Sequence, residues 1–254
     1  MGAIELYRDG DHVNTLLDDA TGIGLAVQAN HHLIAHGKTG IILDPGGHKV
    51  FTQIFGDISN YLGGGELKYL FLSHQDPDII AATNGWLMVT DADAYVSALW
   101  IRFVPHFGVD ALVEDRLKPI PDEGMWLDLE GAQLMVLPAH FLHACGNFQI
   151  YDPIAKILYS GDLGASLGTD YREVPDFDSH VPYMEGFHQR YMVSNVAMKR
   201  WAKMVRQLDL EIIAPQHGAL FRGEEMVNRF IDWCDGLPCG LDLNADVYQL
   251  PPKP

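Results

Sequence analysis

The segment HQDPD at positions 74–78 brings one imidazole and two carboxylates close together along the chain. It directly follows the apolar run LKYLFLS (67–73), which is typical of a strand buried on both faces. In an extended loop, alternate side chains point the same way, so His74, Asp76 and Asp78 would converge on one point. Imidazole and carboxylate donors together suit zinc, manganese or iron. The segment alone is equally compatible with an ordinary polar turn.

Three further apolar runs end directly in a histidine or an aspartate. VLPAHFLH contains His140 and His143, ILYSGD ends in Asp162, and IIAPQHG carries His217. Strand ends on one edge of a sheet lie close together, so donors placed there can meet. A lone histidine at a strand end is usually structural, but recurrence of the same context along one chain indicates a metal site. Spacing leaves His140 and His143 as alternatives.

The surrounding elements predict an α/β fold. In the first half we expect strands at 12–18, 24–36, 39–46 and 67–73 and helices at 49–62 and 80–89. In the second half we expect strands at 132–139, 148–152, 156–162 and 210–218, a long polar and aromatic segment at 163–190, and helices near 194–207 and 224–236. Helices in both halves favour a four-layer αββα sandwich over a doubly wound sheet. We expect a single domain over 1–254, with a loose tail at 244–254.

Bulk composition excludes some classes of partner. Asp and Glu outnumber Lys and Arg by 34 to 17, which gives a net charge of −17. Such a surface repels phosphate backbones and anionic lipids, so we expect neither nucleic acid nor membrane as a partner. The 3 cysteines form no C-x-x-C pair, and the N-terminus has no apolar signal core, which predicts a reduced, cytoplasmic protein.

The order of these motifs resembles that of the metallo-β-lactamase superfamily. The shared features are H-x-x-x-D after a buried strand, a later histidine, an aspartate in a YSGD-like turn and a strand-terminal HG. The acidic residue two positions after the first histidine resembles the di-iron domain of flavodiiron proteins, and free-standing oxygen-binding di-iron proteins look most similar. The resemblance runs from about residue 25 to 235 and implies the αββα sandwich of the metallo-β-lactamase type.

The resemblance also implies a ligand set and favours His143 over His140. One iron would be bound by His74, Asp76 and His143, the other by Asp78 and His217, and Asp162 would bridge the two. Flavodiiron members carry Glu in place of Asp76 and His in place of Ile79. The residue at 79 therefore implies either an open coordination position for O₂ or water, or a weakened second site.

A donor set with as many carboxylates as imidazoles favours iron or manganese over zinc. We expect two iron ions, with manganese or zinc as alternatives, and no flavin in this chain. Without a flavodoxin-like domain to feed electrons, binding or sensing of O₂ or another small diatomic ligand is favoured over rapid turnover. A signalling or redox partner protein would complete that function, and a homodimer is left open.

Three alternatives remain at this stage. One is a metal-dependent hydrolase, for instance a phosphodiesterase, in which a bridging hydroxide attacks an ester. Another is an O₂ or NO reductase with an external flavoprotein donor, and the third is a metal-free scaffold. The G-x-S-x-G match at 164–168 precedes a loop-like stretch, which disfavours a serine nucleophile. We expect Cys145 to be a buried, inert thiol, and Tyr183, Met184, Phe187 and His188 to form either an apolar lid or core packing.

Overall fold

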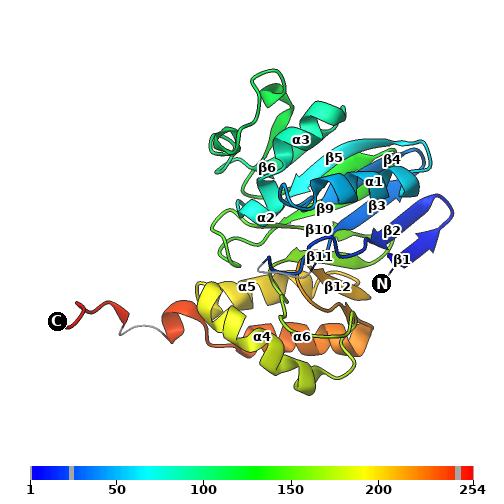
Figure 1. Ribbon diagram of the computed structural model, residues 1–254. Coiled ribbons are helices and arrows are strands. Elements are labelled where there is room, and N and C mark those ends of the chain that lie inside the picture. Colours follow the sequence, from blue (N-terminus) through cyan, green and yellow to red (C-terminus); the bar gives the residue numbers. More distant parts are fainter. Residues whose placement is uncertain (1, 23–25, 244–246, 254) are drawn as a thin grey trace.

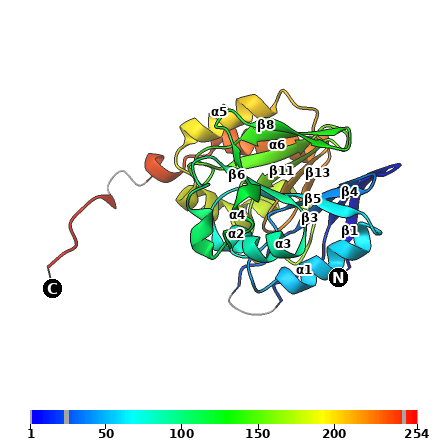
Figure 2. The ribbon, with the colours of Figure 1, turned by 90° about the horizontal axis from the view of Figure 1, so that it is seen from above.

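Two β-sheets pack face to face in the computed structural model, which describes residues 2–22, 26–243 and 247–253 (Figure 1). Helices cover both outer faces, α1 to α3 on one side and α4 to α6 on the other. Figure 2, which looks from above, shows the same arrangement, with the segment after residue 246 leading away from the body. The predicted four-layer αββα sandwich is therefore confirmed.

The first sheet has seven strands, and their order in space is their order in sequence. These are β1 (Ile4–Asp9), β2 (His12–Leu16), β3 (His32–His36), β4 (Thr39–Leu43), β5 (Glu66–Leu72), β6 (Asp93–Ser97) and β7 (Leu117–Ile120). Strands β1 to β4 pair antiparallel, and β4 to β7 pair parallel.

The second sheet has six strands in the order β13-β12-β11-β10-β9-β8. These are β8 (Met125–Leu129), β9 (Ala132–Pro138), β10 (Phe148–Asp152), β11 (Ile157–Gly161), β12 (Ile212–Pro215) and β13 (Phe221–Arg222). Only β11 and β12 pair parallel in this sheet. Both sheets are thus mixed, as the αββα architecture requires.

Six α-helices lie outside the sheets in the part of the chain that the structure describes. These are α1 (Phe51–Tyr61), α2 (Pro77–Ile80), α3 (Thr83–Val89), α4 (Phe177–Tyr191), α5 (Asn195–Val205) and α6 (Glu224–Gly236). Short 3₁₀ turns follow at Val104–Phe107, Glu114–Arg116 and Gly240–Asp242. Among the described residues no helix is both long and apolar enough to cross a bilayer.

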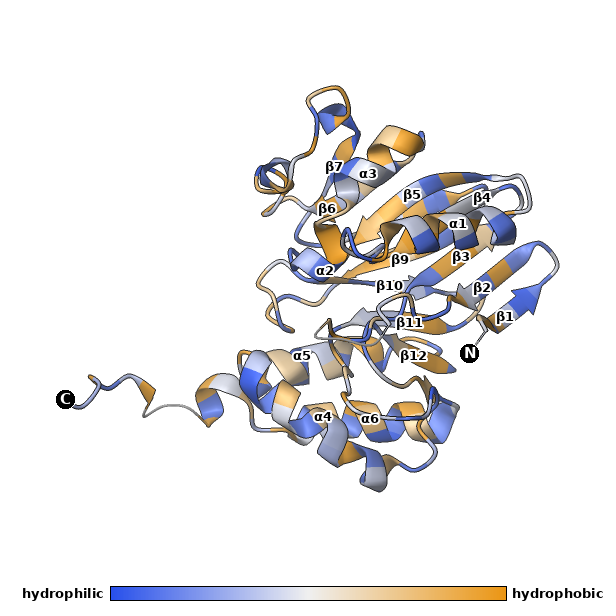
Figure 3. Cartoon of the chain, in the orientation of Figure 1, coloured by the Kyte–Doolittle hydropathy of each residue, from blue (hydrophilic) through white to orange (hydrophobic). Residues whose placement is uncertain are grey.

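Three apolar clusters hold the layers together. One lies between the sheets and includes Phe71 from the first and Phe148 from the second. Another joins the first sheet to α1, α2 and α3 around Trp86, and the third joins the second sheet to α4, α5 and α6 around Phe230. Figure 3 shows hydrophobic residues concentrated on the strands, whereas hydrophobic and hydrophilic residues alternate along α1 and α6. Each helix thus buries one stripe, as its 3.6-residue period predicts.

A buried polar cluster also links the two sheets. The carboxylate of Asp152, at the end of β10, lies 2.7 Å from Nε2 of His12 and accepts a hydrogen bond of 2.7 Å from Nδ2 of Asn14. Asn14 also donates to the Tyr159 hydroxyl, at 2.9 Å. None of the first three side chains is more than 2% exposed. Since buried polar groups are costly unless they are paired, this cluster favours one register between the sheets.

The main error in the predicted elements is the segment 163–190, which contains helix α4. Pro182 and Gly186 lie inside it and disfavour a helix. However, the side chain of Asp176 caps its first turn by accepting from the backbone N–H of Ser179 at 2.9 Å. Burial of its apolar face against the second sheet supplies the remaining stabilisation. The sequence analysis also did not predict β1, β6, β7 or β8.

Two other predictions need adjustment. The helix expected at 80–89 is shorter, as α3, and the separate helix α2 before it was not predicted. The strand expected at 24–36 is confined to β3 among the described residues. Residues 24–25 of that predicted strand, and residues 244–246 and 254 of the predicted loose tail, lie outside the described residues. The described part of the tail, 247–253, is exposed.

Candidate metal centre

The loop after β5 places three of the predicted ligands. Asp76 is the N-cap residue of α2, Pro77 occupies its first turn, and Asp78 follows inside the helix. The expected fully extended loop is therefore wrong beyond Asp76. The reason is local: proline is pre-organised for the first helical position, and a carboxylate is favourable near a helix N-terminus. The turn still directs all three donors to the same side.

The other three predicted ligands follow strands of the second sheet. His143 lies in the loop between β9 and β10, Asp162 comes directly after β11, and His217 comes shortly after β12. These strands are neighbours, and their connecting ends meet at one edge of the sheet. The expectation that strand-end donors converge is therefore correct.

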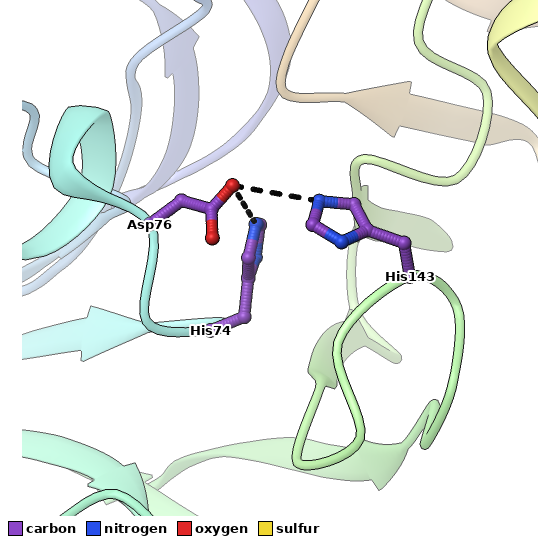
Figure 4. A group of neighbouring side chains, drawn as sticks. All are labelled: His74, Asp76 and His143. Carbon is purple, nitrogen blue, oxygen red and sulfur yellow. Dashed lines mark ion pairs between the residues drawn. The ribbon is translucent and has the colours of Figure 1, made fainter. Parts of the chain in front are cut away.

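His74, Asp76 and His143 form one compact group, with donor atoms within 4.8 Å of one another (Figure 4). Oδ2 of Asp76 lies 3.7 Å from Nε2 of His74 and 3.6 Å from Nε2 of His143. The shorter arm of an aspartate therefore reaches both imidazoles.

Asp162 connects this group to the remaining two donors. Its Oδ2 lies 2.9 Å from Nε2 of His143 and 3.7 Å from Nε2 of His74. Its other oxygen, Oδ1, lies 3.4 Å from Nε2 of His217, and that nitrogen is also 3.4 Å from Oδ2 of Asp78. The six side chains thus form two neighbouring groups of donors, and Asp162 contacts both.

The electrostatics of the cluster favour a cation. Burial alone would lower the pKa of His217, but the adjacent Asp162 carboxylate and its other acceptors raise it to about 9. Burial would likewise raise the pKa of Asp162, but hydrogen bonding with His143 and His217 holds it far below its usual range. The neighbouring carboxylates also raise the pKa of His74, so without a metal, protons on His74 and His217 balance part of the carboxylate charge, and a bound metal would displace them.

Two of the buried side-chain atoms that have no hydrogen-bond partner among the described residues are predicted ligand atoms, namely Nε2 of His74 and Oδ1 of Asp162. Both belong to the cluster and face other donors across it. A buried polar atom without a partner is costly, and a metal ion would satisfy both. The residues present therefore fit a metal centre.

The outward-facing nitrogens of two histidines are held by neighbours. Nδ1 of His217 donates to the backbone carbonyl of Gln28 at 2.5 Å, and Ser73 Oγ lies 3.0 Å from Nδ1 of His74. The backbone N–H of Ser73 in turn donates to Asp44, at 2.8 Å. Such contacts fix the ring and leave Nε2 free to bind. Gln28, Ser73 and Asp44 were not predicted from the sequence, because no local pattern shows which side chains they contact in the fold.

We expect Ser73→Ala to weaken the metal bound at His74 by about 10- to 100-fold, because the imidazole loses the contact that fixes its orientation. Competition with a coloured chelator measures the change. Ser59→Ala, which removes an exposed hydroxyl bonded to the carbonyl of Phe55 on α1, is the matched control. Equal affinities in the two variants would contradict this role for Ser73.

The remaining candidates lie outside the centre. Nε2 of His140 is 2.8 Å from the backbone carbonyl of Asp122, so His140 is held away from the ligands. Cys145 is exposed, contrary to the expected buried thiol, because it lies at the tip of the loop between β9 and β10. Ile79 is fully buried in the apolar cluster under α2 and contributes packing rather than a donor.

The predicted lid is divided between two roles. Phe187 lies against the site, with its ring 6.2 Å from that of His143, and Tyr191, which was not predicted, lies at 5.5 Å. Met184 and His188 are fully buried, and Nε2 of His188 accepts from the backbone N–H of Gly164 at 2.8 Å. Helix α4 thus provides both an aromatic wall for the site and part of the core.

Ser166 is not a nucleophile elbow. Its side chain is 2% exposed, and its Oγ accepts from the backbone N–H of Ala219 at 3.1 Å. Its own N–H donates to the carbonyl of His217, at 3.2 Å. The G-x-S-x-G segment therefore supports the His217 loop.

A cluster of imidazoles and carboxylates at one edge of an αββα sandwich defines a metal-binding protein of the metallo-β-lactamase type. The family model described as "ODP family beta lactamase" matches residues 27–218, and the chain belongs to this family.

Two similar solved structures are a "Peroxy diiron species of chemotaxis sensor ODP" and the "Apo state of chemotaxis sensor ODP from T. denticola". The first is 39% identical with a TM-score of 0.87 and covers 98% of this chain and 100% of that chain. The second is 38% identical with a TM-score of 0.85 and covers 97% and 99%.

A more distant solved structure shares the fold, and one curated protein shows a distant sequence similarity. A variant of the flavo di-iron protein from Thermotoga maritima is 15% identical with a TM-score of 0.75, over 92% of this chain and 60% of that one. An uncharacterized protein of Methanocaldococcus jannaschii is 22% identical over 213 residues, which are 80% of this chain. The chain spans about half (52%) of the length of that curated relative.

Proposed function

We propose that the chain holds two iron ions and senses O₂ by binding it there. The observation that carries this proposal is the orientation of Asp162. Its Oδ2 lies 2.9 Å from Nε2 of His143, and its Oδ1 lies 3.4 Å from Nε2 of His217. A carboxylate that turns one oxygen to each of two donor groups is suited to bridge two ions. When bound, the ions supply the redox-active centre for O₂.

In the proposed centre, His74, Asp76 and His143 hold one ion, Asp78 and His217 hold the other, and Asp162 serves both. Three carboxylates match three imidazoles, and this share of oxygen donors favours iron over zinc. Around the ions, Phe187 and Tyr191 of α4 form an aromatic wall beside His143 that limits the entry of water.

Family relatives support this assignment. The two similar solved structures are described as chemotaxis sensors, one of them in a peroxy diiron state, and both align over nearly the whole chain. We propose that the same sensing role applies here, with a signalling protein as the partner that responds to the state of the centre. Cytoplasmic location and a single domain over 1–254 stay predictions.

A hydrolase receives less support from the site. Among the described residues, the ion pairs of the six candidate ligands are made with one another, and no Lys or Arg pairs with them. Arg and Lys are the side chains that commonly bind a substrate phosphate. A reductase with an external donor would use the same centre, and O₂ consumption under an electron supply separates it from a sensor.

Metal analysis with spectroscopy tests the proposal. Protein produced with iron supplied should carry about two metal ions per chain, with iron in excess of zinc. After anaerobic reduction, exposure to O₂ should produce a visible absorption band, and turnover of phosphodiester and lactam substrates should be negligible. One tightly bound zinc without iron, or hydrolysis that disappears in His143→Ala, would contradict the proposal.

A further inference from the structure

A mainly apolar groove of about 480 Å³ lies between helix α5 and the loop that follows β9. Its walls include Phe141 and Leu142 on the loop, and Val196, Trp201 and Met204 on the helix. Phe141 and Val196 remain 49% and 57% exposed. Exposed large side chains that gather around a concave surface are typical of a site that another molecule covers.

The groove differs in charge from the rest of this acidic protein. No Asp or Glu lines it, whereas four other cavities in the described part of the chain all include carboxylates. Arg200 lines the groove, and Lys199 and Lys203 are exposed on the same helix. By helical periodicity Lys203 lies on the same side of α5 as Val196, two turns further along the helix. A basic rim in a chain of net charge −17 favours an acidic occupant.

The groove also shares two segments with the metal centre. Phe141 and Leu142 immediately precede His143, and the carbonyl of Phe141 accepts from the backbone N–H of Val193 at 3.3 Å. Val193 follows α4, whose residue Tyr191 lies against the His143 ring. A movement of His143 would therefore shift residues on both walls of the groove.

The backbone at Phe141 is strained, which also supports a movement of this loop. Its φ is 69°, in the left-handed region that bulky residues rarely adopt. The backbone N–H of Phe141 donates to the carbonyl of Ala144 at 2.7 Å, across the residue that would bind metal. Strain that neighbouring contacts maintain is often found where a loop has two arrangements.

We propose that this groove binds an acidic segment of a partner protein that presents apolar side chains, and that the state of the metal centre changes its affinity through the Phe141–His143 loop. The coupling to the metal centre rests on the proposed function, whereas the binding of the acidic segment does not. A second copy of this chain is less suited, because two strongly acidic copies repel one another. Its exposed tail VYQLPPK (247–253) is apolar but contains no acidic residue.

The probe is a fluorescent helical peptide with leucine and phenylalanine along one face and glutamate along the other. A control peptide carries lysine in place of glutamate. Fluorescence anisotropy with the iron-loaded protein should show binding of the acidic peptide only. Val196→Glu and Arg200→Glu should each weaken binding by about tenfold or more, because each adds a like charge at the contact. Leu112→Glu and Arg8→Glu, at exposed sites outside the groove, should leave it unchanged.

Coupling is tested by the same titration before and after O₂. The reduced and O₂-exposed proteins should differ in peptide affinity by about fivefold or more, and by linkage the peptide should change the O₂ affinity of the reduced protein by the same factor. Iron content and the O₂-dependent absorption of Val196→Glu should match the wild type, which shows that the variant folds.

Several results would overturn the inference. Equal binding of both peptides, or an equal loss of peptide affinity in Val196→Glu and Leu112→Glu, would contradict a docking site in the groove. A wild-type dimer that Val196→Glu converts to a monomer would assign the groove to a second copy. An equal peptide affinity of the reduced and the O₂-exposed protein would contradict the coupling but not the docking site. Absence of iron and of any O₂ response would instead count against the proposed function. Peptide binding would still show whether the groove is a docking site.

Discussion

Asp162→Asn should lower the iron content from about two ions per chain to less than about half an ion, because a bridging ligand serves both subsites. An asparagine keeps the shape of the side chain but loses the charge and one of the two metal-binding oxygens. His217→Ala should remove only the ion of its own subsite, since His74, Asp76 and His143 keep the other. Elemental analysis of protein purified in parallel measures the three contents.

The control for this comparison is Asp170→Asn, a change at an exposed aspartate in the segment that follows. It should carry the wild-type content of iron, and far-ultraviolet circular dichroism should show that all variants are folded. If Asp162→Asn kept both ions, or lost no more iron than His217→Ala, Asp162 would not be a bridge.

The second large effect concerns stability rather than metal. We expect Asp152→Ala to destabilise the fold by about 3–5 kcal/mol, because it leaves the buried donors of His12 and Asn14 without their acceptor. Urea unfolding of the metal-free protein measures the loss without a contribution from the ions. Asp209→Asn, which breaks the exposed pair with Lys156, should leave the urea midpoint nearly unchanged.

The same carboxylate should shape the acid limit of stability. Burial would raise the pKa of Asp152, but hydrogen bonds from His12 and Asn14 outweigh it and hold the pKa below its ordinary value. In that case the unfolded chain takes up a proton at a higher pH than the folded one. The stabilisation is therefore present above about pH 4 and is lost as the pH falls through the folded pKa. Asp152→Asn should flatten this part of the profile, and an unchanged slope would contradict the pKa shift.

The sequence predicted the layers and the meeting of the donors because both depend on local patterns. The buried ends of β5 and β12 are apolar, and each strand ends two residues before its histidine, so position along the strand was enough to place His74 and His217. The choice of His143 over His140 came from the family resemblance. Periodicity could not make it, because the two residues lie in the same loop and differ only in tertiary contacts.

Helix α4 and the inner polar residues escaped prediction for a different reason. The pattern of α4 is interrupted by Pro182 and Gly186, and its stability comes from a cap and from burial, which single-sequence patterns do not report. Asp152 looked like an ordinary strand-end turn residue. Its partners His12 and Asn14 are far away in sequence and reach it only when the two sheets pack together.

The donors of the centre come from different sheets: His74, Asp76 and Asp78 follow β5 in the first, whereas His143, Asp162 and His217 follow strands of the second. A full coordination shell therefore exists only after the two halves of the sandwich have docked. Iron must enter late in the maturation of the protein, and once present it acts as a cross-link between the halves. A cell short of iron would then accumulate a folded chain whose sheets separate more readily at this edge, so supply of the metal would govern the lifetime of the protein as well as its response.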